Sequence, residues 1–431
     1  MQGRRPIEAN RIHAVVVSIG SAGDLFPMLA MALALRDAGH KVSFLAPGQF
    51  QEQVAPTGLA FHALAVDEAV LDDPGLWDAR KGFGVVWRAT RAAAAQLPAF
   101  VDTLPASEPC VLLVHPLVLP EADLCRAARP DIRIACACLA PSNMPTVHDP
   151  LTLGPLRIPP WMPFIVRRWL WRRAGARLID PVALPGINDA RRQRGLPAVR
   201  SLLTWMFTVP DLTIALFPEW YARTQPDWPR PLLHAGFPLY DPEPGRAIDP
   251  ELARFLDAGH APIAFTPGTG NRQAAQFFAS ALTAAHKLGR RALFLTPHRD
   301  QLPSALPAGV LWRDYVPLAA LLPRVAALVH HGGIGTTAEA LRTATPQLVA
   351  PFAHDQFDNA ARVAALGVGQ VLPGARLDAA RLERSLRELL SSPHVTAQCE
   401  AVALRFGQGP ALGAACAALA GLPLPTQSVR P

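Results

Sequence analysis

The chain has 431 residues, which is enough for two domains of ordinary size. Half of the residues are hydrophobic and 17% are charged, a balance that allows a large core and excludes global disorder. The net charge of +7 suits an anionic ligand or an anionic membrane surface. Nucleic acid is not expected as a partner, because the sequence has no basic-aromatic module and no long Lys/Arg run.

The N-terminal segment reads as a βαβ unit, with a strand over residues 13–19, a glycine turn over 20–24, a helix over 27–38 and a strand over 42–45. A dinucleotide-binding fold is not favoured, because the turn lacks the full GxGxxG pattern and no acidic residue ends the second strand. Asp24 stands instead at the mouth of the helix, where an aspartate can serve as a helix N-cap.

The rest of the first half continues the α/β alternation. A helix is predicted over residues 83–104 and strands over 111–114, 132–138 and 212–216. His115 ends the first of these strands, which in a doubly wound sheet lies beside strand 13–19 across the topological switch point. A lone histidine at a strand end is often structural, so a pairing of His115 with Asp24 stays open. Residues 185–195 read as a helix and the Pro-rich residues 227–244 as an interdomain linker.

Residues 151–205 differ in composition, with arginines and tryptophans mixed at positions 167–173. This mixture indicates either a membrane-surface element or a basic helix beside a binding cleft, and on a helical wheel the arginines spread too widely to decide between the two. The six cysteines include no CxxC pair, and no apolar run approaches about 20 residues. We therefore expect a soluble cytoplasmic protein that is at most peripheral on the inner face of a membrane.

The second half repeats the alternation, with a strand over residues 262–266, a turn over 267–270, a helix over 273–288 and strands over 292–296 and 310–312. The last predicted helices cover residues 379–390 and about 411–421.

The most informative stretch of the chain is residues 326–369. A strand ends at His330, His331 opens a glycine turn, and a helix is predicted to begin at Thr336. Glycines allow a close approach of the backbone to a ligand, and the free N–H groups of a helix start favour an anion. Glu339 follows one helical turn further on, and the pair Asp355 and Gln356 comes after the next strand. These groups are expected at the carboxyl ends of neighbouring parallel strands, where open α/β sheets bind ligands.

This stretch resembles the nucleotide-sugar signature of family-1 glycosyltransferases of the GT-B fold. In that family the histidine of the HxGxG turn binds the diphosphate, an acidic residue eight positions later holds the ribose, and an Asp-Gln pair holds the sugar. His331, Glu339, Asp355 and Gln356 match in identity and spacing. The alternative is a Rossmann-like turn with incidental polar residues.

The resemblance implies an α/β protein of GT-B fold, in which two Rossmann-like parallel-sheet domains face a central cleft. Residues 1–235 would form the acceptor-binding domain, 236–405 the nucleotide-sugar-binding domain, and 406–431 a terminal helix that packs back on the first domain. The family's general base is a histidine in many members and an aspartate in others, so Asp24 is the candidate base and His115 its candidate partner, with the usual order exchanged. The implied donor-binding residues are Gly268, Thr269, Tyr315, Val316, His331, Gly333, Gly335, Thr336, Glu339, Asp355 and Gln356. Leu318 replaces the family's usual glutamine, which leaves one contact to the nucleobase unaccounted for.

A narrower resemblance, to the rhamnosyltransferases of rhamnolipid biosurfactant synthesis, rests on five short motifs: GSAGDLFP (20–27), DPGLWD (73–78), DWP (227–229), GFPL (236–239) and HDQFDNA (354–360). It implies transfer of L-rhamnose from dTDP-L-rhamnose to a hydroxyl of a 3-(3-hydroxyalkanoyloxy)alkanoate. The sequence departs from this group at His331, Thr336 and Thr337, where it is similar to sterol and macrolide glycosyltransferases.

The resulting prediction is an inverting hexosyltransferase that needs no metal and no cofactor beyond its nucleotide-sugar co-substrate. The acceptor would be a hydrophobic hydroxy acid or lipid, with peripheral membrane association as a further expectation. Three alternatives remain: transfer to a sterol, polyketide or other hydrophobic aglycone, epimerisation of a nucleotide sugar without any acceptor, and a non-catalytic partner subunit.

Overall fold

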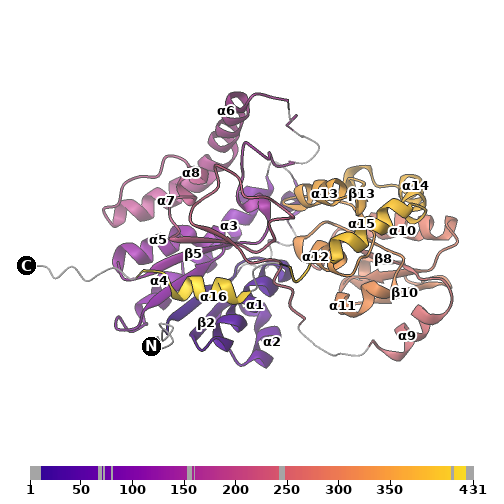
Figure 1. Cartoon of the computed structure of the whole chain (residues 1–431), viewed down its shortest axis with the longest axis horizontal. Helices are drawn as coiled ribbons and strands as arrows, with labels where there is room; N and C mark the ends of the chain where they lie inside the picture. The colour runs from indigo at the N-terminus through magenta and orange to yellow at the C-terminus, as the bar shows by residue number, and fades with distance from the viewer. Residues whose placement is uncertain are drawn as a thin grey trace, which may run out of the picture.

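The computed structural model describes residues 11–66, 70, 73–78, 81–152, 158–159, 161–241, 248–408 and 412–423. These residues form two parallel β-sheets, each flanked by helices (Figure 1). The first sheet has seven strands in the order β3-β2-β1-β4-β5-β6-β7, and the second has six in the order β10-β9-β8-β11-β12-β13. The α/β prediction with two Rossmann-like halves is confirmed.

The central strands of the first sheet are short apolar runs that are buried on both faces, as is usual in parallel sheets. β1 and β4 lie side by side at the point where the strand order reverses. The strands are β1 (His13–Val17), β2 (Lys41–Pro47), β3 (Ala60–Leu64), β4 (Cys110–Val114), β5 (Arg133–Cys138), β6 (Leu212–Ala215) and β7 (Leu232–His234). β7 lies inside the segment predicted to be a linker, of which residues 242–244 fall outside the described residues.

The helices of the first half differ from the predicted ones in three places, one of which is α7, which begins at Asp180 and contains Pro185 instead of starting there. The single helix predicted over residues 83–104 is two helices, α3 and α4, and Pro98 occupies the first turn of α4, where a missing N–H costs no hydrogen bond. The first helix starts at Ala22 rather than at Pro27, because Ser21 and Asp24 cap it. The helices are α1 (Ala22–Asp37), α2 (Gln51–Val54), α3 (Gly82–Ala94), α4 (Leu97–Asp102), α5 (Leu119–Ala128), α6 (Phe164–Ala174), α7 (Asp180–Gln193) and α8 (Leu202–Met206).

The second half is built in the same way around β8 and β11, which are neighbours in its sheet. Its strands are β8 (Ile263–Thr266), β9 (Ala292–Leu295), β10 (Val310–Arg313), β11 (Ala327–His330), β12 (Gln347–Val349) and β13 (Gly369–Val371). Its helices are α9 (Pro250–Asp257), α10 (Ala275–Lys287), α11 (Leu318–Leu321), α12 (Ile334–Arg342), α13 (Gln356–Ala365), α14 (Ala379–Leu390) and α15 (Pro393–Ala403). The chain then crosses to the first half, where α16 (Leu412–Ala420) packs against α1 (Figure 1).

The two halves also touch close to the loops that follow their central strands. α1 contacts α12, so the helix that carries Asp24 meets the helix that follows the His331 turn. In the part of the chain that the structure describes, no helix combines the length and the apolar composition needed to cross a bilayer.

Candidate active site

Asp24 and His115 meet at the switch point of the first sheet. β1 and β4 pair in parallel with Val17 opposite Val114, and the backbone N–H of His115 donates to the carbonyl of Val17. The two side chains therefore emerge at the same edge of the sheet, with Nε2 of His115 3.7 Å from Oδ1 of Asp24. The imidazole is buried, whereas the carboxylate is partly open to solvent.

The hydrogen bonds of His115 define its tautomer. Its Nδ1 accepts the backbone N–H of Leu117 at 3.3 Å, which leaves the ring proton on Nε2, facing Asp24. Burial lowers the pKa of His115 below its ordinary value, and the charge of Asp24 only partly opposes this effect. A neutral imidazole at pH 7 thus directs its N–H toward the Asp24 carboxylate.

Asp24 also caps the helix that carries it. Its Oδ2 accepts the backbone N–H of Ser21 at 2.7 Å and the Ser21 hydroxyl at 3.1 Å. Gly20 has φ +127°, and a Cβ at that position would lie 2.3 Å from Oδ2, so glycine is required for this close approach. Ser21 is the N-cap of α1, so the alternative that Asp24 is the N-cap is wrong: Asp24 is the third helical residue and completes a capping box with Ser21. This role is compatible with the base interpretation, because Oδ2 accepts from Ser21 while Oδ1 faces His115.

The glycine turn of the second sheet surrounds His331. A Cβ at Gly268 would lie 2.9 Å from the imidazole, and a Cβ at Gly333 would lie 2.4 Å from Nε2. The structure thus brings the turn after β8 and the turn after β11 together around one histidine. Burial lowers the pKa of His331 to about 4, so the ring is neutral at pH 7. Its buried Nδ1 has no hydrogen-bond partner among the residues that the structure describes.

The helix after this turn begins two residues earlier than predicted, at Ile334, so that Gly335 and Thr336 lie in its first turn. Gly333 is the N-cap, and no side chain caps the helix. The first backbone N–H groups of α12 are therefore available to an anion. Glu339 lies one turn further along and pairs with Arg342 of the same helix at 2.7 Å, with 16% of its side chain exposed.

Asp355 and Gln356 follow β12 and open α13. Oε1 of Gln356 accepts the backbone N–H groups of Phe352 and Ala353 at 2.8 and 3.1 Å, which closes the loop onto the helix. Oδ2 of Asp355 accepts from Nδ2 of Asn359 at 2.8 Å. Burial, with a further contribution from the charge of Asp24, raises the pKa of Asp355 to about 7. The effect of the Asp24 charge on this pKa means that the loop between β12 and α13 lies within electrostatic reach of Asp24.

Sequence reasoning missed His354 as a site residue. It is a non-glycine residue with φ +55°, and its Cε1 lies 3.1 Å from where a Cβ of Gly82 would stand. Part of the residue is open to solvent, but the neighbouring atoms desolvate the imidazole and so lower its pKa. The charge of Asp24 opposes that shift. A titratable residue directly before Asp355 and Gln356 is the signal that could have identified it.

The residues predicted to contact the nucleobase, Tyr315 and Val316, lie near the β10 edge of the second sheet. Tyr315 follows the edge strand β10 and is 40% exposed, whereas Val316 beside it is buried in the core. β9 and β8 separate β10 from β11, so these two residues are set apart from His331 along the sheet edge. Thr269 stands between them and His331, and its carbonyl lies 3.1 Å from Nε2 of His298.

A buried polar connection joins the first half to the His331 turn. The hydroxyl of Tyr221 donates to Oδ1 of Asn359 at 3.1 Å, and Nδ2 of Asn359 donates to the carbonyl of Gly332 at 2.9 Å. Arg362, one turn after Asn359, binds Asp149 of the first half at 2.9 Å. These contacts therefore link the position of the His331 turn to the packing of the two halves against each other.

Two facing parallel sheets, one with an acidic group at its switch point and the other with a glycine turn before an uncapped helix start, define the class of the protein as a GT-B glycosyltransferase. Residues 14–105 match the glycosyltransferase family 28 N-terminal domain, and residues 292–410 match the C-terminal domain of the erythromycin biosynthesis protein CIII-like family. The chain is 30% identical over 409 residues to the vancomycin aglycone glucosyltransferase of Amycolatopsis orientalis, covering 91% of this chain and 93% of that protein. It is 28% identical over 421 residues to the O-mycaminosyltylonolide 6-deoxyallosyltransferase of Streptomyces fradiae, covering 92% and 95%. The chain belongs to the family-1 glycosyltransferases and is a hexosyltransferase.

Solved structures agree on the fold. The glycosyltransferase of kitacinnamycin superposes with a TM-score of 0.73 at 20% identity, over 96% of this chain and all of that chain. The spinosyn rhamnosyltransferase SpnG superposes with a TM-score of 0.64 at 22% identity, over 95% of this chain and 99% of that chain. SpnG has also been solved in complex with thymidine diphosphate.

Proposed function

We propose that the protein transfers a sugar, with inversion, from a nucleoside diphosphate sugar to a hydroxyl of a hydrophobic acceptor. The observation that carries this proposal is the position of Asp24. Its carboxylate is held by His115 and Ser21 on the first half, and its charge reaches Asp355 and His354 on the second. A base on one half thus faces the sugar-side loop on the other, as an attack in line with a departing diphosphate requires.

Asp24 would accept the proton of the acceptor hydroxyl as that oxygen attacks C1 of the sugar. Oδ1 is the oxygen available for this step, because Oδ2 accepts two hydrogen bonds from Ser21 whereas Oδ1 faces only the more distant Nε2–H of His115. The Nε2–H of His115 orients the carboxylate. His115 is a positioning residue in this scheme, since its imidazole already carries its proton on the side that faces Asp24.

The leaving diphosphate would sit on the His331 turn. The uncapped N-terminus of α12 supplies backbone N–H groups, and the helix dipole favours the charge that develops as the glycosidic bond breaks. Neutral His331 supplies one N–H donor. These donors support departure of the diphosphate without a metal. Glu339 would bind the ribose hydroxyls, Asp355 and Gln356 the sugar, and Tyr315 and Val316 the base, with Gly268 and Thr269 beside the phosphates.

The donor and acceptor follow from the narrower sequence resemblance. We propose dTDP-L-rhamnose as donor and a 3-(3-hydroxyalkanoyloxy)alkanoate as acceptor. The structural likeness to a spinosyn rhamnosyltransferase crystallised with thymidine diphosphate is consistent with this donor. A polyketide or macrolide aglycone is the second candidate acceptor, favoured by the names of the relatives that act on tylonolide and vancomycin aglycones.

α6 would bring the enzyme to a lipid surface. Trp161, Ile165 and Trp169 on and just before this helix are 80%, 83% and 56% exposed, and the helix stands away from the body of the molecule (Figure 1). Cationic side chains share the same surface: Arg168, Arg172 and Arg173. Exposed aromatic and basic groups together favour the interface of an anionic membrane.

The test is to incubate the purified chain with dTDP- and UDP-sugars and with hydroxy-fatty-acid, sterol and polyketide acceptors, and to identify products by mass spectrometry. A rhamnosylated hydroxyalkanoate is the expected product. Sugar conversion without an acceptor would instead identify an epimerase. No turnover of any donor would contradict the proposed function.

A further inference from the structure

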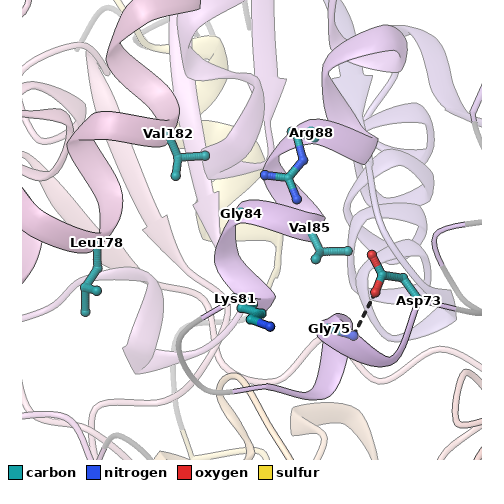
Figure 2. Close-up of a pocket in the computed structure, with 8 residues that line it drawn as sticks. All are labelled: Asp73, Gly75, Lys81, Gly84, Val85, Arg88, Leu178 and Val182. Atoms are coloured by element: carbon teal, nitrogen blue, oxygen red, sulfur yellow. Dashed lines mark hydrogen bonds between the residues drawn. The ribbon is translucent and has the colours of Figure 1, made fainter.

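A cavity of about 350 Å³ lies in the first half, between the short turn Pro74–Trp77, α3 and the segment that leads into α7 (Figure 2). It includes part of the DPGLWD motif, to which neither the donor site nor the base assigns a role. Its volume falls within the range of small-molecule sites. None of the predicted site residues lines it.

The lining of this cavity combines cations with an apolar wall. Arg88 and Lys81 lie on the side of α3, and among the described residues neither side chain has a carboxylate partner. Opposite them, Val182 and Leu178 come from α7 and the π-helical segment before it and form an apolar wall, whereas Val85 lies on α3 beside Asp73 (Figure 2). The one acidic residue of the lining, Asp73, accepts the backbone N–H of Gly75 at 2.7 Å. The cavity therefore has excess positive charge beside a hydrocarbon surface.

The cavity adjoins the catalytic groups through α3. Gly82, next to Lys81, packs so closely that a Cβ there would lie 2.8 Å from the carbonyl of Leu76 and 3.1 Å from the ring of His354. His354 in turn lies within electrostatic reach of Asp24. Lys81 is thus the immediate chain neighbour of the residue that packs on His354, and Arg88 lies six residues further along α3.

We propose that this cavity binds the anionic end of an amphipathic acceptor. Arg88 and Lys81 bind a carboxylate, and Val182 and Leu178 hold the adjacent alkyl chain. An arginine forms paired hydrogen bonds with a carboxylate, and the nearby lysine adds a second charge. The site selects acceptors that carry an acid group over neutral aglycones. This inference rests on the proposed function, because the hydroxyl of the bound acceptor has to reach Asp24.

The test measures binding directly, so that it does not depend on sugar transfer. The full chain is titrated calorimetrically with 3-hydroxydodecanoate and with its methyl ester, which has the same alkyl chain and no charge. We expect the acid to bind more tightly than the ester, with an affinity that falls as salt is added. Arg88→Met and Lys81→Met should each weaken acid binding about tenfold or more and leave ester binding unchanged.

Arg200→Met is the matched control, because Arg200 is exposed, lies outside the cavity and loses the same charge. Equal affinity for acid and ester, no binding of the acid, or the same loss in Arg200→Met as in Arg88→Met would overturn the inference. Failure of the proposed function would look different: the acid would bind and respond to Arg88→Met, while no sugar would be transferred to any acceptor.

Discussion

Replacing Asp24 by asparagine separates the two roles of this side chain. Asparagine keeps the shape of aspartate, and its single side-chain oxygen can still accept from the backbone and hydroxyl of Ser21, which lie 2.7 and 3.1 Å from Oδ2 of the native Asp24. Its amide would then face Nε2–H of His115, so that two donors oppose each other where the carboxylate oxygen stood at 3.7 Å. We expect the free energy of unfolding to change by less than about 1 kcal/mol.

Turnover should respond very differently, because an amide cannot accept the acceptor's proton. General-base catalysis contributes about 100- to 10,000-fold, so kcat should fall roughly 100-fold or more, equivalent to about 2.7 kcal/mol of transition-state stabilisation. Donor affinity should stay near that of the wild type. The assay compares kcat at saturating donor with nucleotide affinity from titration.

Ser21→Ala is the matched control. It removes the capping hydroxyl, costs about 1 kcal/mol of stability and leaves both carboxylate oxygens of Asp24 in place, so kcat should be retained. His115→Ala should lower kcat less than Asp24→Asn, and the double variant should cost less than the sum. An Asp24→Asn enzyme with near-normal turnover would reduce Asp24 to a helix cap and refute the mechanism.

Four further predictions follow from the site. Glu339→Ala should weaken nucleotide binding about 5- to 150-fold in a titration, because the hydrogen bonds to the ribose are lost. Arg342→Ala removes only the ion pair with Glu339 and should not weaken binding. Equal effects of the two variants would contradict the assignment of Glu339 to the ribose. Saturating nucleotide should lower the radius of gyration in small-angle scattering, because the His331 turn and Asp24 lie on different halves. An unchanged radius of gyration would indicate a preformed site. Burial raises the pKa of Asp355 to about 7, so the folded protein keeps this carboxyl protonated while the unfolded chain ionises it above about pH 4. The free energy of unfolding of the wild type should therefore fall as pH rises from about 4 to about 7. Relative to the wild type, Asp355→Asn should become more stable across that window and show no further relative change above it, as measured by denaturation. Substituting Ile165 and Trp169 by glutamate should abolish sedimentation with anionic vesicles while leaving turnover of a water-soluble acceptor intact, and undiminished sedimentation would exclude α6 as the membrane contact.

Local sequence patterns predicted most of the fold, because its central strands are continuous apolar runs that end in glycine turns. The same reasoning did not identify β3, β7 or β13. β3 exposes several of its five side chains, and β7 and β13 have only three residues each, so none shows the period of a buried strand. The break between α3 and α4 was missed because the Ala-rich sequence favours helix on both sides of it.

The candidate site was predictable where residues lie close together in the chain, as with His331 and Glu339 in one turn and helix. The neighbouring position of β1 and β4, which brings His115 to Asp24, followed from the topology of doubly wound sheets. The role of His354 could not be derived in that way. Its contact with Gly82 joins residues from different halves, and such contacts depend on how the halves dock rather than on any local pattern. The hydrogen bond between Tyr221 and Asn359, which are 138 positions apart, is missed for the same reason.

That hydrogen bond has a practical consequence for making hybrid enzymes. Joining the acceptor half of one glycosyltransferase to the donor half of another is a direct route to new sugar–aglycone combinations, and the simplest junction lies in the connecting segment alone. In this chain the contact between the halves is also a matched set of polar partners, in which Tyr221 and Asp149 of the first half meet Asn359 and Arg362 of the second. A hybrid that keeps the second half of this chain and lacks Tyr221 would leave Oδ1 of Asn359 without its hydrogen-bond donor. The same side chain donates to the carbonyl of Gly332, so the His331 turn would be affected. Exchanging the partners together with the halves should preserve the structure of the His331 turn.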